Sequence, residues 1–270
     1  MTVLSDVVAV LDGLYDPRWA DDWDSVGTVT GVPDQPVTKV LLAVDPVAAV
    51  VDEAVAWGAD LVVVHHPLWL KGVTSVAADT PKGRIVHTLI SHGIALHTCH
   101  TNADCPPLGV SESMAFALGV EGVRPLEPDD APERGSGRIG TLSTPVTLDE
   151  FARRVAQRLP SHHSAVRIAG DPDRMIETIA LCGGSGDFLL ATAQAAGADV
   201  YVTSDLRHHP VSEHLEQPDP CAVIDVPHWS AEWTWLPVAA RALTTALPDL
   251  ETHVSTIVTD PWTAHLPGTV

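Results

Sequence analysis

Side chains that commonly bind metals recur at four places in the chain. They are the pairs His65 and His66, His100 and Asp104, His208 and His209, and His228 with Glu232. Imidazole and carboxylate donors suit Zn, Fe, Mn, Co or Ni, and such sites readily leave positions open for water and substrate. Two ions held together favour hydrolysis, because one lowers the pKa of a bridging water while the other polarises the electrophile.

The first histidine pair directly follows a predicted buried strand. Residues 61–64 are Leu-Val-Val-Val, and Pro67 ends the strand just after His65 and His66. Neighbouring strand residues point to opposite faces, so both imidazoles can serve one ion only if the backbone turns between them. Otherwise each serves a different ion. A pair standing alone would also fit one hydrogen-bonded core histidine beside one surface histidine.

The last pair has helical spacing. His228 and Glu232 are four residues apart, so a helical turn puts the imidazole and the carboxylate on one side, where they can share one ion or bridge two. An isolated pair of this kind also fits an ordinary helix surface. Tryptophans flank the expected site and could stack on a base, or pack in the core or a subunit interface: Trp19, Trp23, Trp229 and Trp233.

The first histidine pair belongs to a predicted βαβ unit. Its parts are a strand at 39–45, a helix at 47–57 and the strand at 61–64. Open α/β sheets bind ligands at the carboxyl ends of their strands, where this pattern places the histidines. Further elements are expected at 84–92 (helix), 94–98 (strand), 111–118 (helix), 148–159 (helix with a capping box), 178–181 (strand) and 183–186 (glycine-rich turn).

The second half of the chain restates the first. Residues 195–202 repeat the pattern of residues 56–63, with Gly-Ala-Asp in both, and each copy is followed by His-His-Pro, at 65–67 and 208–210. Residues 127–137 contain prolines, acids and glycines without periodicity. The sequence therefore predicts two similar α/β domains from an internal duplication, residues 1–128 and 129–270.

Composition narrows the classes of function. The 15 basic and 35 acidic residues give 15 − 35 = −20, which argues against a nucleic-acid partner. The four cysteines form no CxxC pair, the first residues lack a basic signal-peptide region, and no apolar run approaches the ~20 residues of a membrane span. We therefore expect a cytoplasmic protein that does not bind membranes.

Taken in order, these segments resemble the dinuclear metal centre protein family, which is called NIF-three-like and is also known as GTP cyclohydrolase I type 2. The resemblance rests on residues 20–27, 42–46, 58–60, 65–67, 100–104, 135–140, 183–186 and 197–199 and on His228 and Glu232. It implies mixed sheets flanked by helices, with a metal site in the cleft between two domains, and a homohexameric ring. Two departures are Thr203-Ser204-Asp205 and Val226-Pro227.

The resemblance also implies roles for the residues already singled out. His65, His66, Asp104, His228 and Glu232 would ligate two divalent ions per chain joined by water or hydroxide, with His100 beside them. In a hydrolase, we expect His100 to take part in catalysis, either as a proton shuttle or as a partner that supports the ligands. His208 or His209 would contact the small-molecule substrate. We expect a hydrolase of a nucleotide-like or phosphorylated compound, of the cyclohydrolase or phosphoesterase type. The alternative is a non-catalytic metal-binding ring that acts as a metal buffer, chaperone or scaffold.

Overall fold

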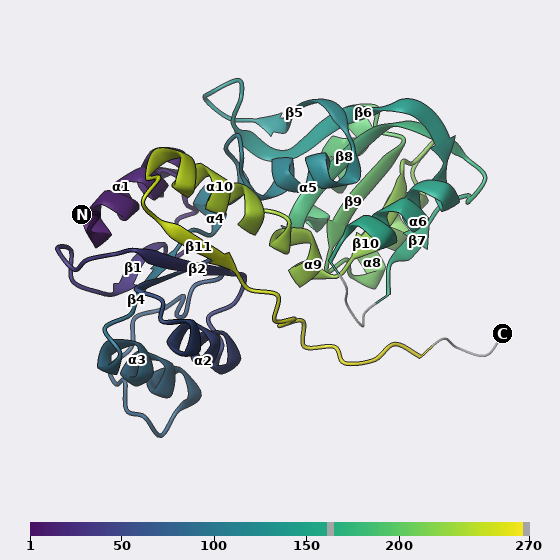
Figure 1. The fold of residues 1–270 in the computed structure, drawn as a ribbon. Coiled ribbons are helices and arrows are strands. Elements are labelled where there is room, and N and C mark those ends of the chain that lie inside the picture. The colour runs from purple at the N-terminus through teal and green to yellow at the C-terminus, as the bar shows by residue number, and fades with distance from the viewer. Residues whose placement is uncertain (161–164, 267–270) are drawn as a thin grey trace. The chain divides into compact units, whose positions relative to one another are not determined.

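The chain divides into two compact units, each with its own sheet. The computed structural model describes residues 1–160 and 165–266 (Figure 1). Unit 1 consists of Met1–Pro106 and Leu236–Thr259. Unit 2 consists of Pro107–Trp235 and the described residues from Asp260 onward. Within the described ranges, no helix is both long and apolar enough to cross a membrane.

Unit 1 is built on a mixed five-stranded sheet in the order β1-β4-β3-β2-β11. Its strands are β1 (Gly27–Thr30), β2 (Lys39–Ala43), β3 (Leu61–Val64), β4 (Ala95–Thr98) and β11 (Glu251–Val254). β1 runs antiparallel to β4, and all other neighbours are parallel. All four residues of β3 are buried, as expected for a central parallel strand.

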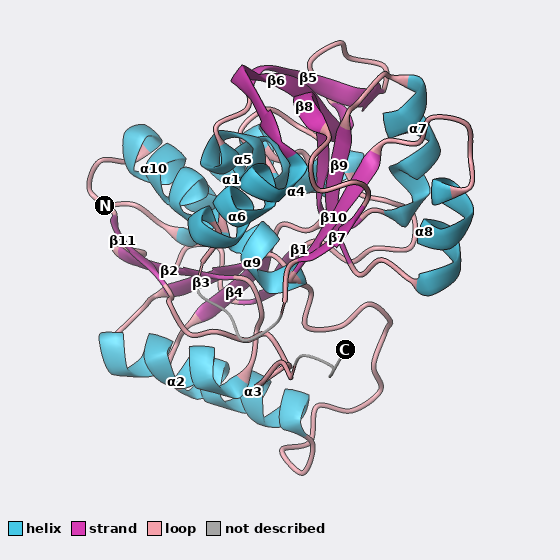
Figure 2. Ribbon diagram, turned by 90° about the vertical axis from the view of Figure 1, so that its right-hand side faces the viewer, coloured by secondary structure: helices cyan, strands magenta, loops and turns pink. Residues whose placement is uncertain are grey.

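Helices cover both faces of this sheet. The helical segments of unit 1 are α1 (Leu4–Leu14), η1 (Pro17–Trp19), α2 (Ala48–Trp57), α3 (Pro81–Ser91), α4 (Thr101–Asp104) and α10 (Leu236–Ala246). α2 and α3 lie on one face, where Val51 and Leu89 pack with Leu41 and Val62 of the sheet (Figure 2). α1 and α10 lie on the other face.

Unit 2 is built on a mixed six-stranded sheet in the order β5-β6-β8-β9-β10-β7. Its strands are β5 (Glu121–Pro128), β6 (Gly135–Thr147), β7 (Arg167–Ala169), β8 (Met175–Ser185), β9 (Val200–Ser204) and β10 (Ala222–Val226). β8, β9 and β10 are parallel, whereas β5, β6 and β7 pair antiparallel with their neighbours. The expected pair of mixed sheets flanked by helices is confirmed.

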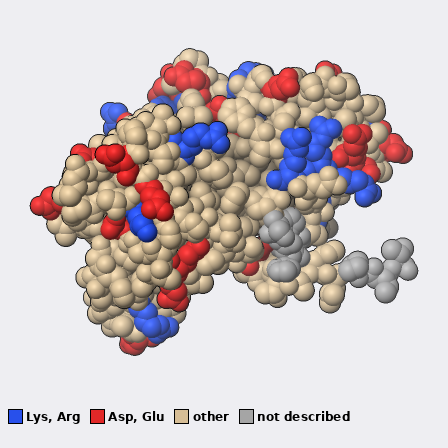
Figure 3. Space-filling view, viewed as in Figure 1, with Lys and Arg blue, Asp and Glu red and all other residues tan. Residues whose placement is uncertain are grey.

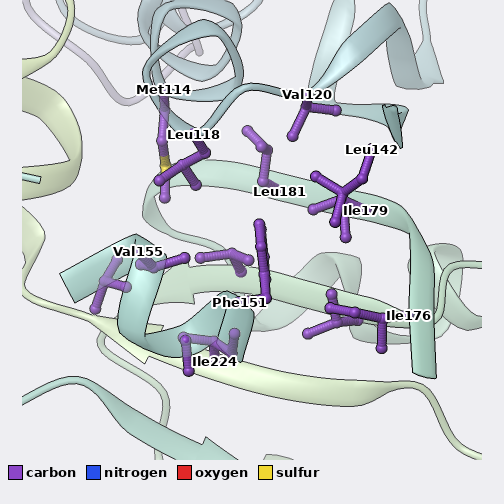
Figure 4. Packing of buried hydrophobic residues seen from close by; sticks show 14 of the residues in the cluster. Met114, Leu118, Val120, Leu142, Phe151, Val155, Ile176, Ile179, Leu181 and Ile224 are labelled. Carbon is purple, nitrogen blue, oxygen red and sulfur yellow. The ribbon is translucent and has the colours of Figure 1, made fainter. Parts of the chain in front are cut away.

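Each face of the second sheet has a hydrophobic core of its own. The helical segments of unit 2 are α5 (Val110–Leu118), α6 (Leu148–Arg158), η2 (Asp187–Leu189), α7 (Leu190–Ala195), α8 (His208–Leu215) and α9 (His228–Trp233). On one face, Met114 of α5 and Phe151 of α6 pack against Ile179 and Ile224 (Figure 4). On the other face, α7 and α8 cover Ala180 and Tyr201 (Figure 2).

The two units repeat one local motif. Gly58 and Gly197 both adopt a positive φ, of 74° and 76°, which ends the preceding helical segment. One carboxylate oxygen of Asp60 accepts from the backbone N–H groups of residues 38 and 39, and one of Asp199 accepts from those of residues 177 and 178. Each Gly-Ala-Asp thus joins its strand to the start of a neighbouring parallel strand.

The division into units differs from the predicted domains 1–128 and 129–270. Residues 128 and 129 lie at the turn of the β5–β6 hairpin, which belongs wholly to unit 2. Residues 236–259 join unit 1 because β11 pairs with β2. Along α6, Arg153 pairs with Asp149 and Arg154 with Glu150. Figure 3 shows other places where basic and acidic side chains lie next to each other on the surface.

Candidate metal centre

The predicted histidine pair lies where β3 ends and the backbone turns. The N–H groups of His65 and His66 both donate to the carbonyl of Val44, at 3.2 and 2.9 Å. This turn brings the two imidazoles to the same side, with ring centroids 5.1 Å apart. Because neighbouring strand residues point to opposite faces, the two histidines could share a side only if the backbone turned, and the structure has this turn.

His100 joins this pair from the end of β4. Its ring centroid lies 5.1 Å from that of His65 and 5.5 Å from that of His66. One ring nitrogen of each of the three residues lies within 4.8 Å of the others, so the three could hold a metal ion. Asp104 lies beside His65, with its Oδ1 3.7 Å from Nε2 of that residue.

An oxygen acceptor fixes the orientation of each imidazole in this group. Nδ1 of His65 lies 2.9 Å from the carbonyl oxygen of Cys99, and Nδ1 of His66 lies 2.7 Å from Asp45. Nδ1 of His100 lies 2.8 Å from Asp24. Since carbonyls and carboxylates only accept, the proton lies on Nδ1 and the lone pair on Nε2. This arrangement is typical of histidines that bind metals through Nε2.

Asp24 is the most enclosed of these acceptors. Its side chain is fully buried, and it accepts from the backbone N–H and the hydroxyl of Thr101 as well as from His100. Burial alone would raise the pKa of this carboxyl, but the hydrogen bonds from His100 and Thr101 hold the pKa well below its usual range. Asp24 therefore stays ionised and keeps Nδ1 of His100 protonated.

The second donor group belongs to unit 2, at the start of α9. Nε2 of His228 lies 2.7 Å from Oε1 of the buried Glu232, and Nδ1 lies 2.7 Å from Asp205. Burial alone would lower the pKa of His228, but the carboxylates of Glu232 and Asp205 raise it to about 11. An imidazole between two carboxylates is a strong site for a cation, whether a proton or a metal ion.

Gly184 makes room for this group. The sequence predicted a glycine-rich turn at 183–186, but β8 continues through Ser185, so that prediction was wrong for residues 183–185. Gly184 has a φ of 73°, and a Cβ placed there would lie 2.7 Å from Oε1 of Glu232 and 3.6 Å from Nε2 of His228. Only glycine lets this strand pass so close to the two donors.

The second His-His-Pro does not form a second copy of the site. Gly58 and Gly197 are 139 residues apart, whereas His65 and His208 are 143 apart, so the two motifs are out of register by four residues. His208 and His209 are exposed and begin α8, and their rings lie 5.1 Å apart. Among the residues that the structure describes, neither groups with other possible metal ligands, and His208 instead lines a separate pocket of unit 2.

Sequence reasoning missed the three carboxylates that orient the imidazoles. Asp24, Asp45 and Asp205 each stand in motifs noted for the family resemblance or for departing from it, but no role was given to them. The available indication was position. Asp45 follows β2, which runs parallel to β3 and its histidines, and Asp205 follows β9, which runs parallel to β10 and the following His228. Trp23 lies beside the site as well, its ring 5.8 Å from that of His100.

The fold and these residues define a class: a mixed α/β protein of two units whose imidazole and carboxylate groups could hold metal ions. The model of the Duf34/NIF3 (NGG1p interacting factor 3) family matches residues 2–261. The chain therefore belongs to this family, and the resemblance noted from its motifs is confirmed.

Known relatives span nearly the whole chain. A Streptomyces coelicolor protein named GTP cyclohydrolase 1 type 2 homolog is 52% identical over 273 residues, covering 98% of this chain and 95% of the relative. A Mycobacterium bovis protein of the same name is 35% identical and covers 96% of each.

Solved structures share the fold. A Bacillus cereus protein related to NIF3 superposes with a TM-score of 0.89 at 22% identity, covering 97% of this chain and 99% of its own. A Staphylococcus aureus hypothetical protein also has a TM-score of 0.89, at 29% identity, with the same coverage. The first likeness concerns the fold alone.

Proposed function

We propose that this chain binds two divalent transition-metal ions and uses them to hydrolyse a small nucleotide-like or phosphorylated substrate. As the family resemblance implies, the ligands would be His65, His66, Asp104, His228 and Glu232. The observation that carries the proposal is the group of His65, His66 and His100, in which each Nδ1 lies against an oxygen acceptor and a ring nitrogen of each residue lies within 4.8 Å of the others. Histidines that only fill a core do not need three such acceptors around one point.

His97, a core histidine of β4, differs from His100, which follows the same strand. His97 is buried in β4, and Nδ1 lies 3.0 Å from the hydroxyl of Thr28. Burial lowers the pKa of His97 to about 4, so this imidazole stays neutral. It does not belong to the group of His65, His66 and His100. His100 instead contacts the ionised carboxylate of Asp24 through Nδ1, and its ring lies beside those of His65 and His66.

The donor set fits hydrolysis. Divalent ions bound by imidazole and carboxylate acidify water and polarise a phosphoryl or ring-carbon electrophile. Asp24 holds the proton on Nδ1 of His100, so the Nε2 lone pair of His100 is available to accept a proton or to bind an ion. The exposed Trp23, at 57% relative exposure, could stack on a base. The names of the relatives suggest one version of this chemistry, the opening of a purine ring by water.

The first test is the metal content per chain, measured by inductively coupled plasma mass spectrometry after reconstitution with Zn, Fe, Mn, Co or Ni. We expect about two equivalents in the natural protein and a clear loss in the His65→Ala/Glu232→Ala double variant. His97→Gln is the matched control, since His97 is a buried histidine outside the donor groups. Metal content that stays the same in the double variant would refute the assignment.

Catalysis is tested separately, on the metal-loaded protein. Turnover of a nucleotide or phosphoester that disappears in Glu232→Gln would support a hydrolase. Stoichiometric metal without turnover of any such compound would favour the metal buffer, chaperone or scaffold. The homohexameric ring, which rests on the family resemblance, is tested by the mass of the assembly in solution.

A further inference from the structure

A pocket of about 400 Å³ in unit 2 has no part in the proposed metal chemistry. It lies at the edge strand β7 and the first turns of α8. None of the proposed metal ligands lines it. Its volume lies within the range of ~300–1,000 Å³ that is usual for small-molecule sites.

The floor of this pocket is apolar. Val223 of β10, Leu206 and Val211 contribute to the lining, and Ile168 of β7 remains 42% exposed there. Such a surface favours a ligand with an apolar body, because covering it removes hydrocarbon from water.

The rim of the pocket carries cationic and donor groups. Arg167, Arg207 and His208 line it together with the carboxylate of Asp225, in a chain that has only 15 basic residues against 35 acidic ones. The Nε and Nη2 atoms of Arg167 donate to Asp225, and those of Arg207 donate to Asp187. These bonds use one edge of each guanidinium and hold it in place. Arginines fixed in this way are suited to binding a carboxylate, sulfonate or phosphate with their remaining donors.

We propose that this pocket binds a small organic anion: a compound with an apolar ring or chain and one carboxylate, sulfonate or phosphate group. The apolar part would cover Val211 and Val223, and the anionic group would contact Arg167 and Arg207. The proposal does not depend on the metal centre.

Two dyes of the same shape test both halves of the argument on the full chain. 8-Anilinonaphthalene-1-sulfonate carries an apolar ring system and an anion, and N-phenyl-1-naphthylamine is its uncharged counterpart. We expect one saturable site for the sulfonate, measured by fluorescence. The Arg167→Gln/Arg207→Gln double variant should weaken sulfonate binding about tenfold and leave the uncharged dye almost unaffected, since only the charge-assisted contacts are lost.

Variants that fill the pocket locate the site. Val211→Trp, or Ser212→Trp if the first does not fold, should abolish binding of both dyes. The matched control is Ala191→Trp. Ala191 lines another cavity of unit 2, which has a volume of about 530 Å³ and is also lined by Asp187 and Glu213. Sulfonate binding that survives both pocket-filling variants, that is lost equally in Ala191→Trp, or that ignores the arginine double variant would overturn the proposal.

Discussion

Replacement of Gly184 by alanine separates backbone strain from the loss of a metal ligand. The φ of 73° is left-handed backbone, which costs a residue with a Cβ roughly 1–2 kcal/mol. In addition, the new methyl group would lie 2.7 Å from Oε1 of Glu232, closer than such contacts occur, so the buried carboxylate must move. We therefore expect Gly184→Ala to lose stability and to lose metal affinity at the His228 and Glu232 group.

The chain offers a matched control at Gly197. Its φ is 76°, but a Cβ placed there meets nothing within 4 Å, so Gly197→Ala carries the backbone strain alone. Both variants should lower the thermal unfolding midpoint by about 2–8 °C, given the strain and the size of the unit.

Only Gly184→Ala should weaken metal binding, by about 10- to 100-fold, the range for disturbing the groups around a bound metal. Isothermal titration calorimetry with the reconstituting metal measures this difference. Equal metal affinities in the two variants would refute the role given to Gly184.

Three further predictions follow from named contacts. Asp24→Asn should weaken metal binding about 10-fold or more in a chelator competition assay, because His100 loses its charged acceptor. Asp225→Leu should also weaken metal binding, because Asp225 accepts from the N–H of Leu206 and so holds the preceding Asp205, at φ 57°, against His228. Asp225→Asn keeps an oxygen acceptor and should not weaken it. Burial lowers the pKa of His97 to about 4 in the folded protein, against 6.5 in the unfolded chain. The unfolded chain therefore binds the proton first, and the free energy of unfolding falls by about 3 kcal/mol as the pH drops from above 6.5 to 4. His97→Gln should remove that part of the fall in urea titrations.

Local elements were predictable because their patterns are local. β3, α2 and α5 begin and end within two residues of the predicted bounds, as valine runs and left-handed glycines at Gly58 and Gly119 determine them. Thr147 caps α6 as its capping box indicated, by accepting from the N–H of Glu150. Such signals need only neighbouring residues.

Pairing between distant segments was not predictable in the same way. The return of residues 236–259 to unit 1 depends on which strand edge β11 meets, and the short, mostly polar sequence of β11, Glu-Thr-His-Val, does not specify a partner. The extension of β8 through Gly183 and Gly184 runs against the usual indication of a glycine-rich stretch. The reason for glycine at position 184 is the close approach of Glu232, which a side chain there would block.

The sequence allowed the possible metal ligands to be singled out, but not the carboxylates that orient their imidazoles. Histidines at a strand end and a helical His/Glu pair are visible in the sequence, since ligand types are few. Asp45 and Asp205 had only their positions after strands to mark them, and Asp24 could not be told from the many other acidic residues of this chain. Their role depends on hydrogen bonds to residues that lie, for Asp24 and His100, 76 positions apart.

The parallel pairing of β11 with β2 also has a consequence for synthesis on the ribosome. Glu251 pairs with Lys39, which leaves the tunnel about 200 residues earlier, so the first sheet waits for its fifth strand until residues 107–235 of unit 2 have been translated. Meanwhile the edge of β2 lacks its neighbour, and open strand edges attract other chains. Nascent chains stalled between residues 110 and 235 should therefore depend on chaperones more than released ones.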